Sequence, residues 1–351
     1  MRRKRGLWLT LVGMLAFSLM AGCSNSGNNG GNNGGGNEGS DKPAQTTNGT
    51  NAAEAGSGGG KLVVGFAQIG QESGWRDAET ASIKETFESD SNFELKFSDA
   101  QGKQENQIKA IRTFIAQKVD AIGLAPVVES GWETVLKEAK DAGIPVFLLD
   151  RGITKGNEDL YTSFIGSDFI LEGQNAAKWM VEELGADAKV NIVQLEGTVG
   201  ASAANDRKKG FEDAIKDKAN YKIVYSQTGD FTRAKGKEVM EAYLKQSKDI
   251  QVVYAHNDDM ALGAIQAIEE AGLKPGTDIK IIGVDGVKAA FEAIAAGKMN
   301  VTVECNPLLG PQLKQAILDQ KAGKTLDKWI KSEEDVYAGQ KAIDALPNRK
   351  Y

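Results

Sequence analysis

The sequence predicts an α/β protein built from two doubly wound parallel sheets. From Lys61 onward, short apolar runs alternate with segments in which apolar residues recur at helical spacing. Regular alternation of this kind implies parallel strands with helices on both faces. The alternation restarts midway, and the roughly 290 residues that follow the N-terminal segment suffice for two domains with separate cores. We therefore expect two lobes.

Four strands are expected in the first half of the pattern. Each is short, apolar or alternating, and bounded by turn residues, which is typical of strands. They are LVVGFAQI (62–69), FELKFS (93–98), AIGLA (121–125) and PVFLL (145–149). Helical spacing of apolar residues is found between them, at 75–90, 104–117 and 130–142.

The second half of the pattern repeats the first with more elements. Its expected strands are 161–166, 190–195, 222–227, 252–255, 279–284 and 301–304. Its expected helices are 170–184, 203–217, 232–246, 258–271 and 287–296. We therefore expect a second doubly wound sheet.

Polar and aromatic residues follow nearly every expected strand. In open parallel sheets, ligands lie outside the carboxyl ends of the strands. The residues at these ends are Glu72-Ser73-Gly74-Trp75-Arg76, Asp150-Arg151, Glu196-Gly197-Thr198 with Arg207 on the next helix, Asp230-Phe231, His256-Asn257-Asp258-Asp259 and Asp285-Gly286. A sugar needs this set, because its hydroxyls require paired donors and acceptors and its C–H surface requires aromatic faces.

Each of these residues also has a structural interpretation, which the sequence leaves open. Trp75 and Phe231 are core candidates, although a Trp at a strand-to-helix turn is badly placed for burial. Asp150-Arg151 is a candidate ion pair, and Arg207 is a candidate member of a solvated charge run. Either Asn257 or Asp258 is expected to cap the helix at 258–271, and Asp285-Gly286 is a good turn dipeptide.

The N-terminus predicts export and a lipid anchor. Residues 1–22 place four basic residues before a charge-free apolar run that ends in small residues, which is typical of a signal peptide and not of a membrane span. Cys23 follows and resembles the lipidated cysteine of a bacterial lipoprotein; a plain secretory signal with an incidental cysteine is the alternative. Residues 23–60 are rich in Gly, Asn and Ser, and we expect a flexible tether there.

Composition narrows the classes of function. Removal of residues 1–22 deletes four basic and no acidic residues, so the net charge moves from −6 to −10, which disfavours nucleic acid as a partner.

With Cys23 acylated, Cys305 has no disulfide partner. His256 is the only histidine, so we expect no metal site. Gly323-Lys324-Thr325 imitates part of a phosphate-binding loop, but Leu318 replaces its first glycine, and no cofactor is expected.

From Lys61 onward the chain resembles the sugar-binding proteins of bacterial ABC importers, the ribose/galactose type of periplasmic binding protein, and most of all their galactofuranose-binding branch. The resemblance rests on QESGWRDAET (71–80), QGKQENQIKAIRTFIAQKVDAI (101–122), APVVESGWETVLKEAKDAGIPVFLLDR (125–151), EGTVGASAANDRKKGF (196–211), GDFTRAKGKEVME (229–241) and YAHNDDMALGAIQAIEEAGLKPG (254–276). It implies a type I clamp of two lobes joined by three crossings. The lobes would be 61–165 plus 304–335 and 166–303 plus 336–351.

The resemblance also implies a ligand-binding site between the lobes. The first lobe would contribute Glu72, Ser73, Gly74, Trp75, Arg76, Asp150 and Arg151, and the second Arg207, Asp230, Phe231, Asn257 and Asp285. Trp75 and Phe231 would face opposite sides of the sugar ring, with Arg151 and Arg207 donating and Asp150 and Asp285 accepting. Glu304 is a weaker candidate. Cys305 departs from the family pattern, and we expect it to pack as a small apolar residue.

The implied function is capture of a monosaccharide, galactofuranose or a related sugar, and its delivery to an ABC permease with a cytoplasmic ATPase. The protein would be a monomer, not an enzyme, lipid-anchored on the outer face of the cell membrane. Two alternatives are a sugar sensor that presents its ligand to a chemoreceptor or sensor kinase and, more remotely, a carbohydrate-active hydrolase using paired carboxylates.

Overall fold

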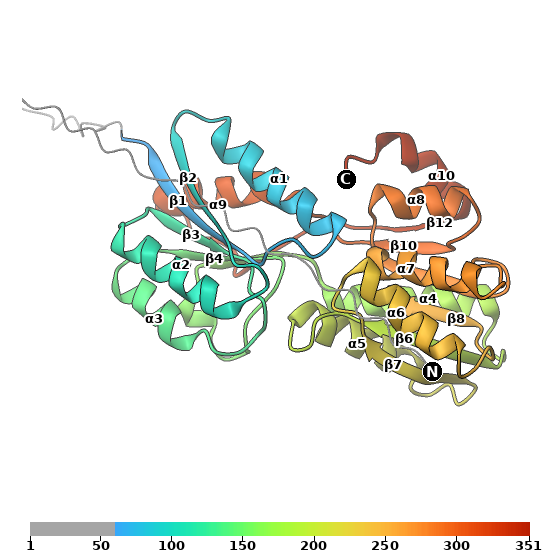
Figure 1. The fold of residues 1–351 in the computed structure, drawn as a ribbon. Helices are drawn as coiled ribbons and strands as arrows, with labels where there is room; N and C mark the ends of the chain where they lie inside the picture. Colours follow the sequence, from blue (N-terminus) through green and yellow to red (C-terminus); the bar gives the residue numbers. More distant parts are fainter. Residues whose placement is uncertain (1–59) are drawn as a thin grey trace, which may run out of the picture. The chain divides into compact units, whose positions relative to one another are not determined.

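The computed structural model describes residues 60–351, which belong to one compact unit, Gly58–Tyr351 (Figure 1). The signal peptide, Cys23 and all but the last residue of the expected tether lie outside the described residues. Residues 60–351 form two six-stranded sheets, each flanked by helices. The predicted fold class, with two doubly wound lobes, is thereby confirmed.

The first sheet is parallel throughout and has the strand order β11-β5-β4-β3-β1-β2. Its strands are β1 (Leu62–Gln68), β2 (Phe93–Asp99), β3 (Ala121–Leu124), β4 (Val146–Leu149), β5 (Ser163–Gly166) and β11 (Trp329–Lys331). Two apolar clusters lie on opposite faces of it. One contains side chains of α2 (Gln104–Ala116) and α3 (Glu133–Asp141), and the other contains those of α1 (Gly74–Glu88) and α9 (Gly310–Lys321) (Figure 1).

The second sheet has the order β12-β10-β9-β8-β6-β7 and is parallel except for β12, which runs antiparallel to β10. Its strands are β6 (Val190–Glu196), β7 (Tyr221–Thr228), β8 (Val252–Ala255), β9 (Lys280–Asp285), β10 (Val301–Glu304) and β12 (Val336–Ala338). Its helices are α4 (Phe169–Leu184), α5 (Ser202–Ile215), α6 (Arg233–Leu244), α7 (Asp258–Glu270), α8 (Lys288–Ala295) and α10 (Gly339–Ala345). A single apolar cluster fills its core. Two short 3-10 turns, Glu158–Leu160 and Leu346–Asn348, complete the described elements.

Three segments cross between the sheets. Residues 167–168 lead from β5 to α4, residues 305–309 lead from β10 to α9, and residues 332–335 lead from β11 to β12. The domain boundaries expected from the sequence fall beside these crossings. The edge strands β11 and β12 were not expected, because three residues are too few to show a strand period. The antiparallel β12 is likewise a departure from the all-parallel expectation.

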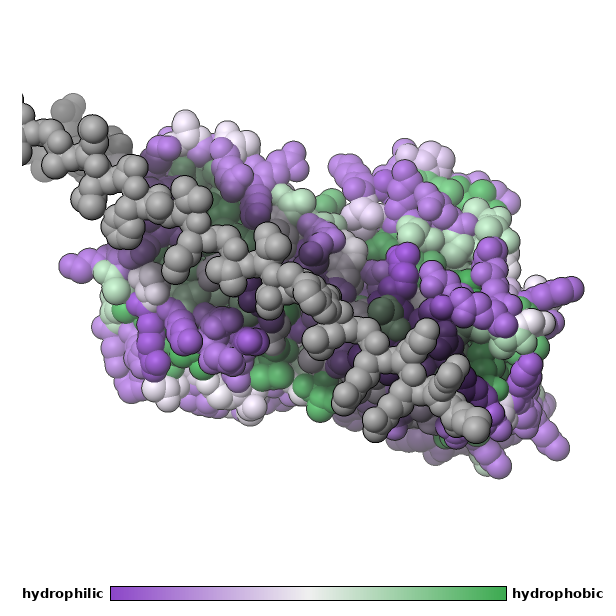
Figure 2. All heavy atoms as spheres, in the orientation of Figure 1, coloured by the Kyte–Doolittle hydropathy of each residue, from purple (hydrophilic) through white to green (hydrophobic). Residues whose placement is uncertain are grey.

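Charged and polar side chains dominate the face drawn in Figure 2, where apolar residues show only as small separate patches. Apolar residues of β3, β4, β8 and β10 are buried in the cores. Within residues 60–351, no helix combines the length and the apolar character that a membrane crossing requires.

Candidate functional site

A cavity with about 260 Å³ of empty space lies where strand ends of both sheets meet. Strand ends and first helical turns supply most of its lining, as the topology of parallel sheets predicts. The first lobe contributes what we call the first wall, which consists of Glu72, Ser73, Trp75, Arg76, Asp150 and Arg151. The second wall consists of Ala203, Arg207, Phe231, Asn257 and Asp285, and Cys305 lines the cavity from a crossing.

An ion network holds the first wall together. Arg76 is 1% exposed, and its guanidinium contacts Glu79, Asp150 and, at 3.4 Å, Glu72. Arg151 pairs with Glu72 and lies 3.7 Å from Asp150. Burial alone lowers the pKa of Arg76, but the three carboxylates outweigh burial and raise that pKa well above its ordinary value. The guanidinium of Arg76 is therefore held as a cation.

Local backbone features position the first wall. The Ser73 hydroxyl accepts a hydrogen bond from Arg76 N and caps α1, so the side chain of Ser73 serves the helix as well as the cavity. Asp150 has a φ of 60°, a left-handed conformation that is uncommon for a non-glycine residue. Gly166 lies against it, and a Cβ there would come within 3.2 Å of the Asp150 backbone. The sharp turn after β4 therefore depends on a glycine in β5.

The second wall is organised around Arg207, which is 3% exposed. Its Nε donates to Glu172 at 2.6 Å and its Nη1 to the His256 carbonyl at 2.6 Å, whereas Nη2 lies 3.7 Å from Asp285. Burial, countered only in part by Arg207, raises the pKa of Asp285 well above its ordinary value. The close approach of α4 to α5 requires Gly173, since a Cβ there would lie 2.3 Å from the Arg207 carbonyl oxygen.

Asn257 and Asp258 have different roles. Asn257 Oδ1 accepts from Met260 N and caps α7, and its Nδ2 donates to the Phe231 carbonyl at 2.9 Å. Asn257 is thus the expected helix cap and also lines the cavity. Asp258 accepts from the backbone of Gly286 and Val287 and from Thr302, so it holds the turn that carries Asp285.

Two aromatic side chains lie in the lining, one from each wall. Trp75 is 4% exposed and packs in the apolar cluster of the second lobe, with its indole N–H donating to the Cys305 carbonyl at 2.6 Å. The expectation that Trp75 is badly placed for burial is therefore wrong in this arrangement, because the opposite lobe covers it. The Arg151 guanidinium lies 4.9 Å from the Phe231 ring centre, a cation–π contact across the lobes.

Three expected site residues do not line the cavity. Gly74 N donates to Asp259 Oδ2 at 2.8 Å, a contact between the lobes. The Asp230 carboxylate accepts from the Thr228 hydroxyl, and Glu304 is paired with Arg349 at 2.7 Å. Ala203 and Cys305 line the cavity without having been expected.

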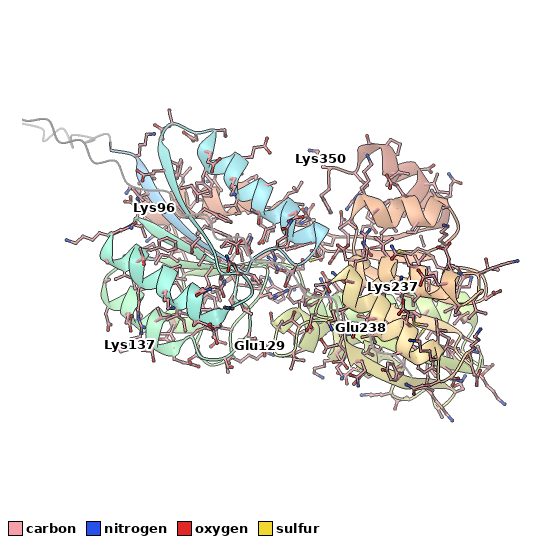
Figure 3. All side chains as sticks on the ribbon, in the orientation of Figure 1. Lys96, Glu129, Lys137, Lys237, Glu238 and Lys350 are labelled. Carbon is pink, nitrogen blue, oxygen red and sulfur yellow. The ribbon has the colours of Figure 1, made fainter. Side chains whose placement is uncertain are left out.

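Hydrogen bonds outside the lining also join the lobes. Glu129, from the loop after β3 (Figure 3), accepts from Asn205 Nδ2 at 3.1 Å, and its backbone N–H donates to Gly200 O at 2.9 Å. Gly152 N donates to the Ser202 hydroxyl at 2.9 Å. Together with the Gly74–Asp259 bond, these contacts hold the two walls closely opposed.

The family model that matches this chain describes a periplasmic binding protein domain and covers residues 64–317. The chain is 51% identical over 293 residues to the galactofuranose-binding protein YtfQ of Escherichia coli, a match that spans 82% of this chain and 92% of that protein.

Two solved structures are also similar. The binding component of an arabinose ABC transporter from Shewanella sp. ANA-3, bound to alpha and beta-L-arabinofuranose, is 49% identical with a TM-score of 0.79, over 82% of this chain and 95% of that one. A structure from Mycobacterium smegmatis in complex with beta-D-fucofuranose is 52% identical with a TM-score of 0.80, over 83% and 95%.

Proposed function

Because this chain belongs to the periplasmic binding protein family, we propose that it captures a monosaccharide in the furanose form between its lobes and delivers it unchanged to an ABC permease. One observation carries the proposal. A small cavity is enclosed by guanidinium, carboxylate, amide and aromatic groups that come from both lobes.

The size and the chemistry of the cavity support a sugar. The space among the lining residues is small, about 260 Å³ with its solvent-open part included, which favours a monosaccharide over an oligosaccharide. The Nε atoms of Arg76 and Arg151 are buried without an acceptor among residues 60–351. Hydroxyl and ring oxygens are suitable acceptors for these donors, and the Asp285 carboxylate is a suitable acceptor for a hydroxyl.

The relatives support a furanose ring form. The names of the three similar proteins given above specify galactofuranose, arabinofuranose and fucofuranose. We propose that this chain binds a furanose of the same kind, galactofuranose or a close relative. Trp75 and Phe231 would cover the C–H surface of the ring, while Arg151 and Arg207 would donate to its oxygens.

Binding would proceed by closure. An empty closed cavity leaves buried donors unpaired, at about 1–3 kcal/mol each. A sugar supplies the missing partners and shifts the population from open to closed lobes. The closed form would then be recognised by the permease. The carboxylates of the first wall are engaged by arginines, which supports capture without turnover.

The ring form is tested by NMR on the protein mixed with D-galactose labelled with ¹³C at carbon 1, and separately with labelled L-arabinose. We expect one bound anomeric signal at the furanose position, although the pyranose dominates the free sugar. A bound signal at the pyranose position would refute the ring assignment, and no bound signal with either sugar would count against sugar capture. Sugar recovered after incubation is expected to be unchanged.

We also propose that the protein acts outside the cytoplasm, anchored by lipid at Cys23. The basic and apolar N-terminal residues and Cys23 itself support this proposal. Palmitate labelling of the full chain in a bacterial host tests it, with Cys23→Ala as the variant. We expect the label and membrane association to be lost together, and labelling that survives in Cys23→Ala would exclude this anchor.

A further inference from the structure

One carboxylate connects all three crossings between the lobes. Glu334 belongs to the crossing 332–335, and its Oε1 accepts from the Ser167 hydroxyl in the crossing 167–168. The same oxygen accepts from Asn306 N, at 3.3 Å, in the crossing 305–309. Ser167 Oγ also lies 3.2 Å from Cys305 Sγ. Hydrogen bonds of Glu334 thus join the three segments that a change in the angle between the lobes would move.

The surroundings of Glu334 hold more negative than positive charge. Side-chain atoms of Glu172, Cys305 and Glu334 lie within 4.8 Å of one another. Glu172 is 2% exposed, and its Oε1 has no hydrogen-bond partner among residues 60–351. Arg207 is the cation nearest to this group, and it is bonded to Glu172 Oε2.

Most other charges on the neighbouring segments are already paired, and Glu333, which has no ion-pair partner among residues 60–351, is exposed. Lys331, just before the crossing, is paired with Asp168 at 2.9 Å, and Asp335, just after Glu334, is paired with Lys341. Asp285 shares Arg207, at 3.7 Å. Glu172 is buried and Glu334 is half-buried, and two carboxylates this close are poorly compensated by one guanidinium, so one of them favours its protonated form.

We propose that Glu334 is a proton-operated clasp of the hinge, which holds a proton while the lobes are closed and releases it when opening admits water. The proposal rests on the hydrogen bonds that join Glu334 to the other crossings and on the excess of negative charge around it. Only its second test depends on the proposed function.

The direction of the effect follows from linkage. Burial, and next the Glu172 charge, raise the pKa of Glu334 from 4.5 to about 8 in this closed arrangement. Opening hydrates the carboxyl and returns its pKa toward the ordinary value. Because the closed state has the higher pKa, protonation favours closure. That advantage is complete below the open-state pKa and is lost as the pH rises through about 8.

The first test uses the sugar-free protein and small-angle scattering in EDTA, from about pH 6 to about pH 9. We expect the wild type to shift toward open lobes as the pH rises. Glu334→Gln keeps an oxygen for Ser167 and Asn306 but cannot ionise, so its scattering should change less with pH than that of the wild type. The matched control is Glu333→Gln at the exposed neighbour, which should behave as the wild type. A Glu334→Gln profile that follows the wild type would overturn the clasp.

The second test measures proton uptake when D-galactose or L-arabinose binds, by calorimetry near pH 7 in buffers of different ionisation enthalpy. We expect the wild type to take up as much as one proton more than Glu334→Gln when sugar binds. As the pH rises, the sugar affinity of the wild type should therefore fall more steeply than that of the variant, by up to about tenfold per pH unit. Equal uptake in the two proteins would overturn the proposal. Failure of both sugars to bind would count against the proposed function alone, because the scattering test does not use them.

Discussion

The two walls of the cavity differ in how their charges are paired. The first wall places two guanidinium groups among the carboxylates of Glu72, Glu79 and Asp150, and it leaves the Nε donors of Arg76 and Arg151 without acceptors. The second wall has Arg207 alone, and no hydrogen bond among residues 60–351 ends on the Asp285 carboxylate. The first wall thus offers spare donors, and the second offers a spare acceptor beside the Nη2 atom of Arg207. A hydroxylated ligand must touch both walls to satisfy both needs.

Replacement of an arginine should show the difference between the two walls most strongly. Arg207→Met leaves Glu172 and Asp285, both at most 3% exposed, without a cation, and we expect a loss of about 3–5 kcal/mol in the free energy of unfolding. Arg151→Met should cost less, because Arg76 remains beside Asp150 and the Glu72 side chain is 14% exposed. Urea unfolding of the sugar-free protein checks this order, and equal losses in the two variants would contradict the difference between the walls.

Both walls are predicted to be necessary for binding. Trp75→Ala and Arg151→Ala change the first wall, and Phe231→Ala changes the second. We expect each to weaken sugar binding by at least about 2 kcal/mol, roughly 30-fold, which removes a measurable signal in titration calorimetry for a weak ligand. Circular dichroism should show folded protein in each case. Wild-type affinity in Trp75→Ala and Arg151→Ala would refute the first wall as a binding surface.

The spare acceptor of the second wall predicts a pH effect. The pKa of Asp285 is raised in the folded protein by burial, so the folded state favours the protonated form and its stability falls as the pH rises toward that pKa. Asp285→Asn removes this contribution, so its free energy of unfolding should fall less between about pH 5 and about pH 9, while its sugar affinity drops. Asp230→Asn is the control, since Asp230 is exposed and outside the lining. An unchanged pH profile in Asp285→Asn would rule out this role.

The contacts that join the walls outside the cavity should have the smallest effect. Asp259→Ala removes the acceptor for Gly74 N, and Glu129→Ala removes the acceptor for Asn205. Each substitution lowers the free energy that favours the closed lobes by about 0.5–1.5 kcal/mol. We therefore expect a roughly two- to tenfold faster release of sugar, with little change in the association rate. Glu238→Ala is the control, because Glu238, which is labelled in Figure 3, is exposed, and it is paired with Lys235. Stopped-flow rates equal to the wild type in both variants would show that these bonds do not contribute to closure.

The sequence predicted most of the cavity lining because parallel strands place their carboxyl ends together, so polar residues after separate strands meet. It did not indicate Glu79 or Glu172, which lie inside helices. Nothing in a helical period distinguishes a buried carboxylate that serves an arginine from an exposed one. The place of Glu304 depends on Arg349 in the C-terminal tail, a long-range pairing that carries no local signal. The burial of Trp75 was misjudged because the residues that cover it belong to the other lobe.

The intrinsic fluorescence of Trp75 should report whether the lobes are open or closed. Its N–H is bonded to a carbonyl of a crossing, and the guanidinium of Arg76 lies 4.8 Å from its ring centre. Opening the lobes would break that bond and expose the ring to water, so the emission wavelength of Trp75 should shift when the lobes open or close. Trp132, buried inside the first lobe, should stay constant and provide an internal reference. Unlabelled protein in a cuvette would then report its own occupancy.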